Sequence, residues 1–318
     1  MPLVDHLTPV DIFGPWSAKR DDRAAFTDFN LPSGSKVRQY LCMSGKAENA
    51  PLIVGCSATS AMQVYVAFAA KALGTPGIVY VPKRNTPSAS TAWARGMGIE
   101  VNEVAPGYLS FVRKLAKDRA KSLGPVVRWD VDFALRDTTY QCQNVPHHLR
   151  RVVVPVGTGL ICAGIMAGLA LYGGGKTEVL GVGVSDMSDK DKIVSLARKM
   201  TAQALPNLTL IRHPLPYDRG VAAVLPDGSP LDPYYAAKAL AYVQEGDCLW
   251  VPGVRPLGAF PKECLDKLLQ LNPSLSNTYR QAGELRLGAL PNFQGLSDLL
   301  PPLLPTRAPE TVLDLLQA

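Results

Sequence analysis

The sequence predicts an α/β protein of two domains, each built on a mostly parallel β-sheet covered by helices. Short apolar runs alternate with helical runs and are joined by short glycine links, which is typical of parallel sheets. The alternation begins at Pro51, is interrupted by a polar, irregular stretch at residues 138–150, and begins again at Arg151. With 318 residues, of which 47% are hydrophobic and 19% charged, the chain can bury cores of this kind.

The first series of elements follows Pro51. Short apolar runs predict strands at residues 52–55, 77–82 and 99–101. Runs with helical spacing predict helices at residues 59–73, 88–96 and 108–122. Gly74 ends the first of these helices, and the last is charged and amphipathic. A parallel sheet with helices on its faces is therefore expected.

The second series begins at Arg151. Its expected strands cover residues 151–156, 179–184 and 249–251, and its expected helices cover residues 160–172, 190–204 and 234–245. Residues 152–172 carry no charge and are long enough to cross a bilayer. Pro155 and the change from β-branched to Ala/Gly/Leu-rich composition instead favour a buried strand followed by a buried helix. Beyond Phe260 the sequence predicts leucine-rich helical pieces interrupted by prolines.

A glycine turn, Gly157-Thr158-Gly159, joins the strand at 151–156 to the helix at 160–172. A strand that turns through glycines into a helix directs several backbone N–H groups and the positive end of the helix to one point. Such a point binds anions, most often phosphate. A tight strand–helix junction without a ligand is the alternative.

Charge and cysteine content exclude little by themselves. The net charge of +6 is compatible with a polyanionic partner but does not require one. The six cysteines are widely spaced, with no C-x-x-C pair and no matching histidines, so neither a metal site nor a disulfide framework is expected. The N-terminus has no signal-peptide pattern, which favours a cytoplasmic protein.

Four segments in order resemble the fold type II (tryptophan synthase β-like) enzymes that use pyridoxal 5′-phosphate (PLP). The resemblance is strongest to the branch of aminocyclopropane-carboxylate deaminase and D-cysteine desulfhydrase. Residues 19–22 with 33–38 resemble the motifs K-R-D-D and G-G-N-K-x-R, and residues 55–71 resemble G-x-x-x-S-N-H followed by an Ala-rich helix. Residues 157–164 resemble G-[ST]-G-G-T-x-A-G, and residues 231–239 resemble L-D-P-V-Y-x-G-K-A. The resemblance covers about residues 19–260.

This resemblance implies two three-layer α/β/α domains with the cofactor in the cleft between them. Residues 1–48 and 145–260 would form the large PLP-binding domain, and residues 49–144 the small α/β domain. Residues 261–318 would be a C-terminal helical extension of unknown role. A homodimer is also implied.

The resemblance assigns Lys36 the Schiff base with PLP. It assigns the 5′-phosphate to Gly157, Thr158, Gly159, Leu160 and Ile161. Thr59 and Ser60 correspond to the residues that face the substrate and the cofactor O3′, although hydroxyl residues here also suit a helix N-cap. Tyr235 corresponds to the family's active-site tyrosine, a candidate acid/base group, whereas Tyr234 is expected in the core.

The chain departs from the family at several of these positions. Leu160 and Ile161 replace a glycine and a threonine, which removes one hydroxyl donor. Ala61 replaces a polar residue, and Ala236 stands where the deaminases place an acid near the pyridine nitrogen. Without that acid the ring is a weaker electron sink, which argues against simple aminocyclopropane-carboxylate deaminase activity.

Other polar groups are expected to be structural. Asp21 and Asp22, beside Lys19 and Arg20, predict a charge cluster, and the histidines at 147–148 predict a solvated connector.

The function that the resemblance implies is that of a PLP-dependent lyase or deaminase. It would act at Cα of an amino-acid substrate through an external aldimine, and deamination, β-elimination and decarboxylation all remain open. A second interpretation is a lyase or decarboxylase for an amino acid attached to a carrier, such as a hypermodified base in phage DNA. A third is a non-catalytic binding protein with this fold. The expected partner is a small amino acid or an amino-acid-modified nucleic acid, not a membrane.

Overall fold

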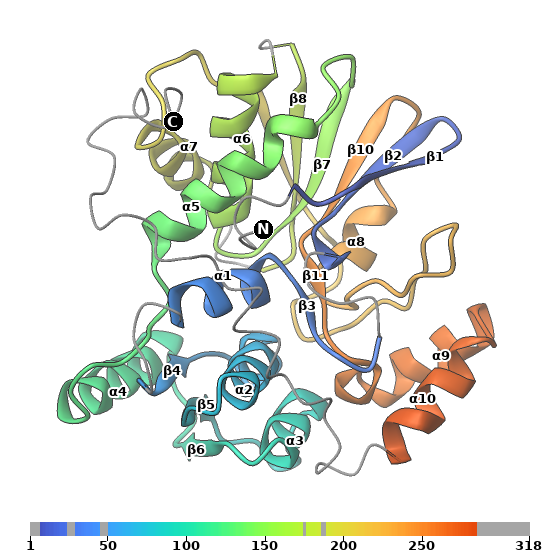
Figure 1. Cartoon of the computed structure of the whole chain (residues 1–318). Helices are drawn as coiled ribbons and strands as arrows, with labels where there is room; N and C mark the ends of the chain where they lie inside the picture. The colour runs from blue at the N-terminus through green and yellow to red at the C-terminus, as the bar shows by residue number, and fades with distance from the viewer. Residues whose placement is uncertain (1–6, 24–28, 45–49, 174–175, 186–188, 285–318) are drawn as a thin grey trace.

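The computed structural model describes residues 7–23, 29–44, 50–173, 176–185 and 189–284. Its strands form sheets of six, three and two strands. Figure 1 shows the six-stranded sheet in the upper half of the molecule and the three-stranded sheet with its helices below it. The expected α/β fold with mostly parallel sheets is confirmed.

The large sheet has the strand order β1-β2-β10-β7-β8-β9. These strands are β1 (Val10–Phe13), β2 (Trp16–Arg20), β7 (Arg151–Val156), β8 (Glu178–Gly183), β9 (Leu208–Arg212) and β10 (Asp247–Val251). Neighbouring strands are parallel except β1 and β2, which form an antiparallel hairpin at the edge. Neither this hairpin nor β9 was expected from the sequence, because their runs mix charged and apolar residues.

Both faces of the large sheet are covered by helices, as strand β7 illustrates. Val152, Val154 and Val156 share a core with α5 (Val131–Tyr140), α6 (Leu160–Tyr172) and α7 (Lys190–Arg198). Val153 points to the opposite core, which contains α8 (Ala236–Leu240). A strand buried on both faces reads as a continuous apolar run, which explains the uncharged sequence here.

The small sheet consists of β4 (Leu52–Gly55), β5 (Gly77–Pro82) and β6 (Glu100–Val104), all parallel. One face packs on α1 (Ser35–Ser44) and α2 (Met62–Ala72) through Leu52 and Val79, with α3 (Ala89–Gly96) beside α2. On the other face Ile53 and Ile78 pack on α4 (Leu109–Ser122). This unit is therefore also a three-layer structure.

The remaining elements connect or extend these units. Strands β3 (Ser33–Gly34) and β11 (Gly253–Val254) pair antiparallel, and helices α9 (Lys262–Leu271) and α10 (Leu275–Glu284) follow. Short 3₁₀ helices cover Asp21–Arg23, Gln141–Asn144 and Leu257–Ala259. Helices beyond Phe260 were expected; the rest of the extension lies outside the described residues.

Some helix boundaries differ from the prediction. The expected helix at 234–245 is only Ala236–Leu240, and the one at 190–204 ends at Arg198. The stretch 138–150, expected to be irregular, begins inside α5. That helix fits closely on α6 because Gly164 is small: an added Cβ would lie 2.6 Å from Thr138 Cβ.

The uncharged residues 152–172 form β7 and the buried α6, as expected. In the part of the chain that the structure describes, no helix combines the length and the apolar character needed to cross a bilayer.

Candidate functional site

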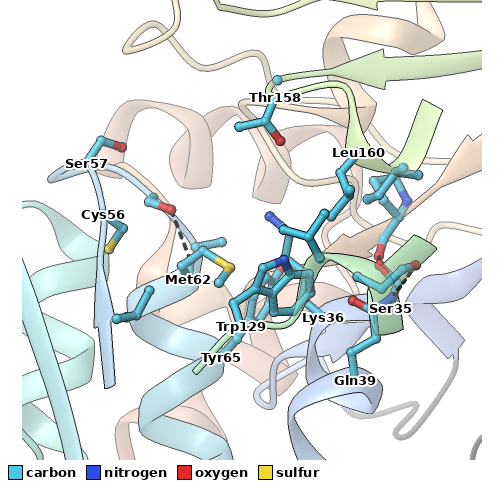
Figure 2. Close-up of a pocket in the computed structure, with 18 of the residues that line it drawn as sticks. Ser35, Lys36, Gln39, Cys56, Ser57, Met62, Tyr65, Trp129, Thr158 and Leu160 are labelled. Carbon is cyan, nitrogen blue, oxygen red and sulfur yellow. Dashed lines mark hydrogen bonds between the residues drawn. The ribbon is translucent and has the colours of Figure 1, made fainter. Parts of the chain in front are cut away.

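A cavity of about 1220 Å³ lies between the two three-layer units. The carboxyl ends of β4 and β7 open into it, with Cys56 following one strand and Gly157 following the other. Ligands in open α/β sheets bind at this edge of the strands. Figure 2 shows Lys36 in the cavity, with Thr158 and Leu160 on one side and Ser57 and Met62 on another.

The glycine turn forms one wall of the cavity and begins helix α6. Gly159 has φ of +87°, and an added Cβ would lie 2.4 Å from Ile193 Cγ1, so only glycine fits there. The N–H of Ala163 donates a hydrogen bond to the carbonyl oxygen of Gly159, which begins the intrahelical ladder. The earlier N–H groups of the first turn lack an intrahelical acceptor and suit an anion, as predicted for Gly157–Ile161.

Lys36 enters the cavity from the first turn of α1. This turn is fixed because both the N–H and the hydroxyl of Ser35 donate to Pro252 O, at 3.0 and 3.1 Å. Gly34 permits the approach, because an added Cβ would lie 2.4 Å from Gly253 Cα. Lys36 Nζ lies 5.8 Å from the centre of the Trp129 ring.

The environment of Lys36 favours a neutral amine. Burial lowers the pKa of Lys36 to about 8, and the charges of Arg113 and Arg255 act in the same direction, whereas Asp232 opposes them. An amine with this pKa is about half unprotonated near pH 8, far more than an ordinary lysine, so it can act as a nucleophile or base at mildly basic pH.

The loop between β4 and α2 contributes hydroxyl groups, but not all those expected. Ser60 lines the cavity, and its Oγ accepts a hydrogen bond from the Met62 N–H at 3.2 Å. Thr59 is buried and is not among the described residues that line the cavity; its carbonyl accepts a hydrogen bond from Arg255 at 3.1 Å. Ser57, which the sequence prediction missed, lines the cavity instead. Its position two residues beyond the carboxyl end of β4 was the available signal.

Tyr235 lies in the cavity wall against the glycine turn. An added Cβ at Gly157 would lie 3.3 Å from its ring, and its hydroxyl is 3.1 Å from that of Tyr217. Burial raises the pKa of Tyr235 well above 10, and Tyr217 adds to this effect, so the phenol stays protonated. Tyr234 is buried, as expected, under the Arg255 guanidinium at 4.6 Å.

A buried arginine, Arg255, is ion-paired within its own unit and donates hydrogen bonds to the small unit beside the cavity. Arg255 Nε donates to Asp232 Oδ2 at 2.8 Å, and Arg255 Nη1 donates to Ser90 Oγ at 2.8 Å and to Thr59 O. Asp232 lines the cavity, whereas Ala236 provides no acid. Arg255 could not be predicted from a local motif, because its partners come from distant segments.

The other polar groups singled out in the sequence lie away from the cavity. Asp21 and Asp22 are buried; Asp22 pairs with Arg20 at 2.7 Å, and Asp21 accepts from Trp250 Nε1 at 3.0 Å. The histidines at 147–148 are exposed. The structural interpretation of these residues is thus confirmed.

The cavity therefore combines a helix N-terminus, whose turn admits only glycine at position 159, with a lysine of lowered pKa. This donor set fits a cofactor that carries a phosphate and an aldehyde, which is the chemistry of PLP.

The chain is similar in structure to several solved proteins. An ACC deaminase homologue superimposes with a TM-score of 0.66 at 20% identity, over 85% of this chain and 95% of that protein. Diaminopropionate ammonia lyase from Escherichia coli gives 0.58 at 11% identity, over 85% and 89% of the two chains. The processed form of threonine deaminase isoform 2 from Solanum lycopersicum superimposes with a TM-score of 0.55 at 14% identity, over 86% of this chain and 85% of that protein.

None of the curated proteins matches the sequence. The structural similarities, at identities this low, establish the shared fold type II. A family model described as "Pyridoxal-phosphate dependent enzyme" matches residues 27–211, which is more than half of the chain and includes Lys36 and the glycine turn. This chain belongs to the family of pyridoxal-phosphate dependent enzymes, and its cofactor is pyridoxal 5′-phosphate.

Proposed function

We propose that this protein is a lyase of the deaminase or ammonia-lyase type that breaks a bond at Cα of an amino-acid substrate. One observation carries the proposal: Lys36, with a pKa lowered to about 8, shares a cavity with the glycine turn. A lysine amine and an anion cradle that face the same cavity can hold the two ends of the cofactor.

The cofactor, when bound, supplies an electron sink for the negative charge left at Cα. Gly157, Thr158 and Gly159 with Leu160 and Ile161 would hold its phosphate, and Ser60 would lie near its ring oxygen. Lys36 Nζ would hold the cofactor and, once released, move the proton at Cα. Ser57 is suited to accept or donate a hydrogen bond to the substrate, a role that the sequence had assigned to Thr59.

Tyr235 is proposed as a proton donor or an orienting group. Its raised pKa keeps the hydroxyl protonated, so it can donate a proton to a leaving group but is a poor base. No acid occupies position 236, and the nearby Asp232 is ion-paired with Arg255. A weakly protonated ring favours elimination of a good leaving group over the ring opening that aminocyclopropane-carboxylate requires.

Borohydride labelling tests the site directly. The protein is loaded with PLP, reduced, digested and analysed by mass spectrometry. We expect the label on Lys36 and not on Lys117 or Lys192, which also line the cavity. Ammonia release is then measured with D- and L-serine, threonine, 2,3-diaminopropionate and aminocyclopropane-carboxylate. A label on another lysine contradicts the site; no ammonia from any of these substrates, with Lys36 labelled, contradicts the reaction type.

The rate of cofactor loading is expected to depend on pH with a midpoint near 8. Only the neutral amine can bond to the aldehyde, and the lowered pKa of Lys36 means that it is neutral above about pH 8. The loading rate of the apoprotein should therefore rise from pH 6, reach half its maximum near pH 8 and level off about one to two pH units higher, as followed by absorbance. A rate that keeps rising to pH 10 indicates an ordinary lysine.

A second candidate is a lyase for an amino acid attached to a larger carrier. The cavity volume of about 1220 Å³ supports it, because pockets for drug-sized ligands span roughly 300–1,000 Å³.

A further inference from the structure

One face of helix α4 is directed into the cavity and carries two cations. Leu109, Arg113, Ala116 and Lys117 line the cavity, and their spacing of three and four residues places them on one side of the helix. The neighbouring basic residues Lys114 and Arg119 do not line it. All four basic side chains are exposed, but only Arg113 and Lys117 face the cavity, at its solvent-accessible side.

The end of strand β4 is built to bring this face close. A Cβ added at Gly55 would lie 2.7 Å from Val112 O and 2.8 Å from Arg113 Cα, both in the backbone of α4. The absence of a side chain at Gly55 lets the helix backbone reach the loop that carries Ser57. Arg113 is near enough to Lys36 for its charge to lower the pKa of that amine.

The cations on this side of the cavity have no protein counter-charge. Arg128, which precedes α5, lines the cavity together with Arg113 and Lys117. Within the described residues, no carboxylate lies within ion-pair distance of these three side chains. The acids of the cavity wall are Asp130, whose Oδ1 caps α5, and Asp232, which pairs with Arg255.

The cradle for the cofactor phosphate lies on a different wall. It belongs to α6 and is backed by Ile193 of α7, and the adjacent Lys192 extends the cavity on that side. Arg113 and Lys117 instead come from the small unit, on the helix that covers the small sheet. The helix N-terminus with Lys192 and the cations Arg113 and Lys117 are therefore two separate regions suited to anions that face one cavity.

We propose that Arg113, Lys117 and Arg128 form a second anion site, which binds a phosphate group of the substrate itself. The inference rests on the proposed function and narrows its substrate class to amino acids that carry a phosphate away from Cα. Arginine guanidinium groups suit phosphate because two parallel N–H donors match two of its oxygens. The phosphate can belong to a small phosphorylated amino acid or to a polynucleotide that carries the amino acid.

The test is calorimetric titration of the PLP-loaded protein, in which the cofactor occupies the glycine turn. The first probe is phosphoglycolate, with glycolate as its matched control without phosphate; neither has an amine that reacts with the cofactor. The second probe is a single-stranded 12-nucleotide DNA at two salt concentrations, because phosphodiester contacts weaken as salt rises. The variant R113Q/K117Q is compared with K114Q/R119Q, which removes the same charge from the outer face of the same helix.

We expect phosphoglycolate to bind at least tenfold more tightly than glycolate, and R113Q/K117Q to lose this preference while K114Q/R119Q keeps it. If DNA binds and R113Q/K117Q weakens this binding while K114Q/R119Q does not, the phosphate belongs to a polynucleotide. If phosphoglycolate binds and DNA does not, the phosphate belongs to a small substrate. The proposal is overturned if neither probe shows a preference for phosphate, or if both double variants lose it equally. Failure of cofactor loading contradicts the proposed function alone, because the same variants titrated without cofactor still report on the basic face.

Discussion

Replacing Lys36 by alanine is expected to lower turnover by at least about a thousandfold, within the range produced by removing a positioned acid–base group. Lys36 is the cavity lysine for which burial and two arginines lower the pKa to about 8. Alanine removes both the amine that holds the cofactor and the group that moves the proton at Cα. The side chain projects into the cavity, so the fold should persist, as checked by circular dichroism.

Lys117→Ala and Lys192→Ala provide matched controls, because both residues line the same cavity. Each should retain the visible absorbance of the bound cofactor, which Lys36→Ala should lose. Ammonia release from whichever amino acid proves active is the second readout. The assignment is contradicted if Lys36→Ala keeps a tenth of the activity. It is also contradicted if Lys192→Ala loses the absorbance of the bound cofactor as completely as Lys36→Ala does.

Much of the fold could be predicted because the buried parallel strands leave a clear signal. The runs at β4, β5, β7 and β8 are apolar because both sheet faces are covered. The hairpin of β1 and β2 left no such signal. Strand β1 lies at the sheet edge, where polar residues are tolerated, and β2 buries Lys19 and Arg20, which contact Thr8 O and Asp22. Helix α8 is shorter than expected because helical spacing alone does not show where the chain turns into β10.

The site could be predicted in part, for a comparable reason. Lys36 and the glycine turn sit in local motifs, and the cavity brings both together. Ser57, Arg113 and Arg255 were missed because their contribution depends on tertiary contacts. Gly55, for example, matters through its contact with α4, more than fifty residues later in the chain. Thr59, predicted to face the substrate, is not among the described residues that line the cavity, and a motif alignment does not show which hydroxyl of a short loop does so.

A buried charge network joins α1 to α5 behind the cavity. Arg38 Nε and Nη2 donate to the two carboxylate oxygens of Asp137 at 2.9 and 2.8 Å, and Gln39 Nε2 donates to the same carboxylate at 2.6 Å. Arg38 and Asp137 are 1% and 3% exposed. The pair fixes helix α1, and with it Lys36, against helix α5 of the neighbouring unit. A charge this deeply buried is costly unless its partner stays in place.

Asp137→Ala is therefore expected to lower the free energy of unfolding by about 3–5 kcal/mol, because it leaves the Arg38 guanidinium buried without its bidentate partner. The control is Asp130→Ala on the same helix, which removes an exposed N-cap, a 2.9 Å hydrogen bond from the Phe133 N–H, and should cost about 1 kcal/mol. Urea unfolding followed by tryptophan fluorescence measures both. If Asp137→Ala costs no more than Asp130→Ala, the buried pair does not hold α1 in place. A loss of the expected size, together with slower loading of PLP onto the folded variant, would tie the position of Lys36 to this network.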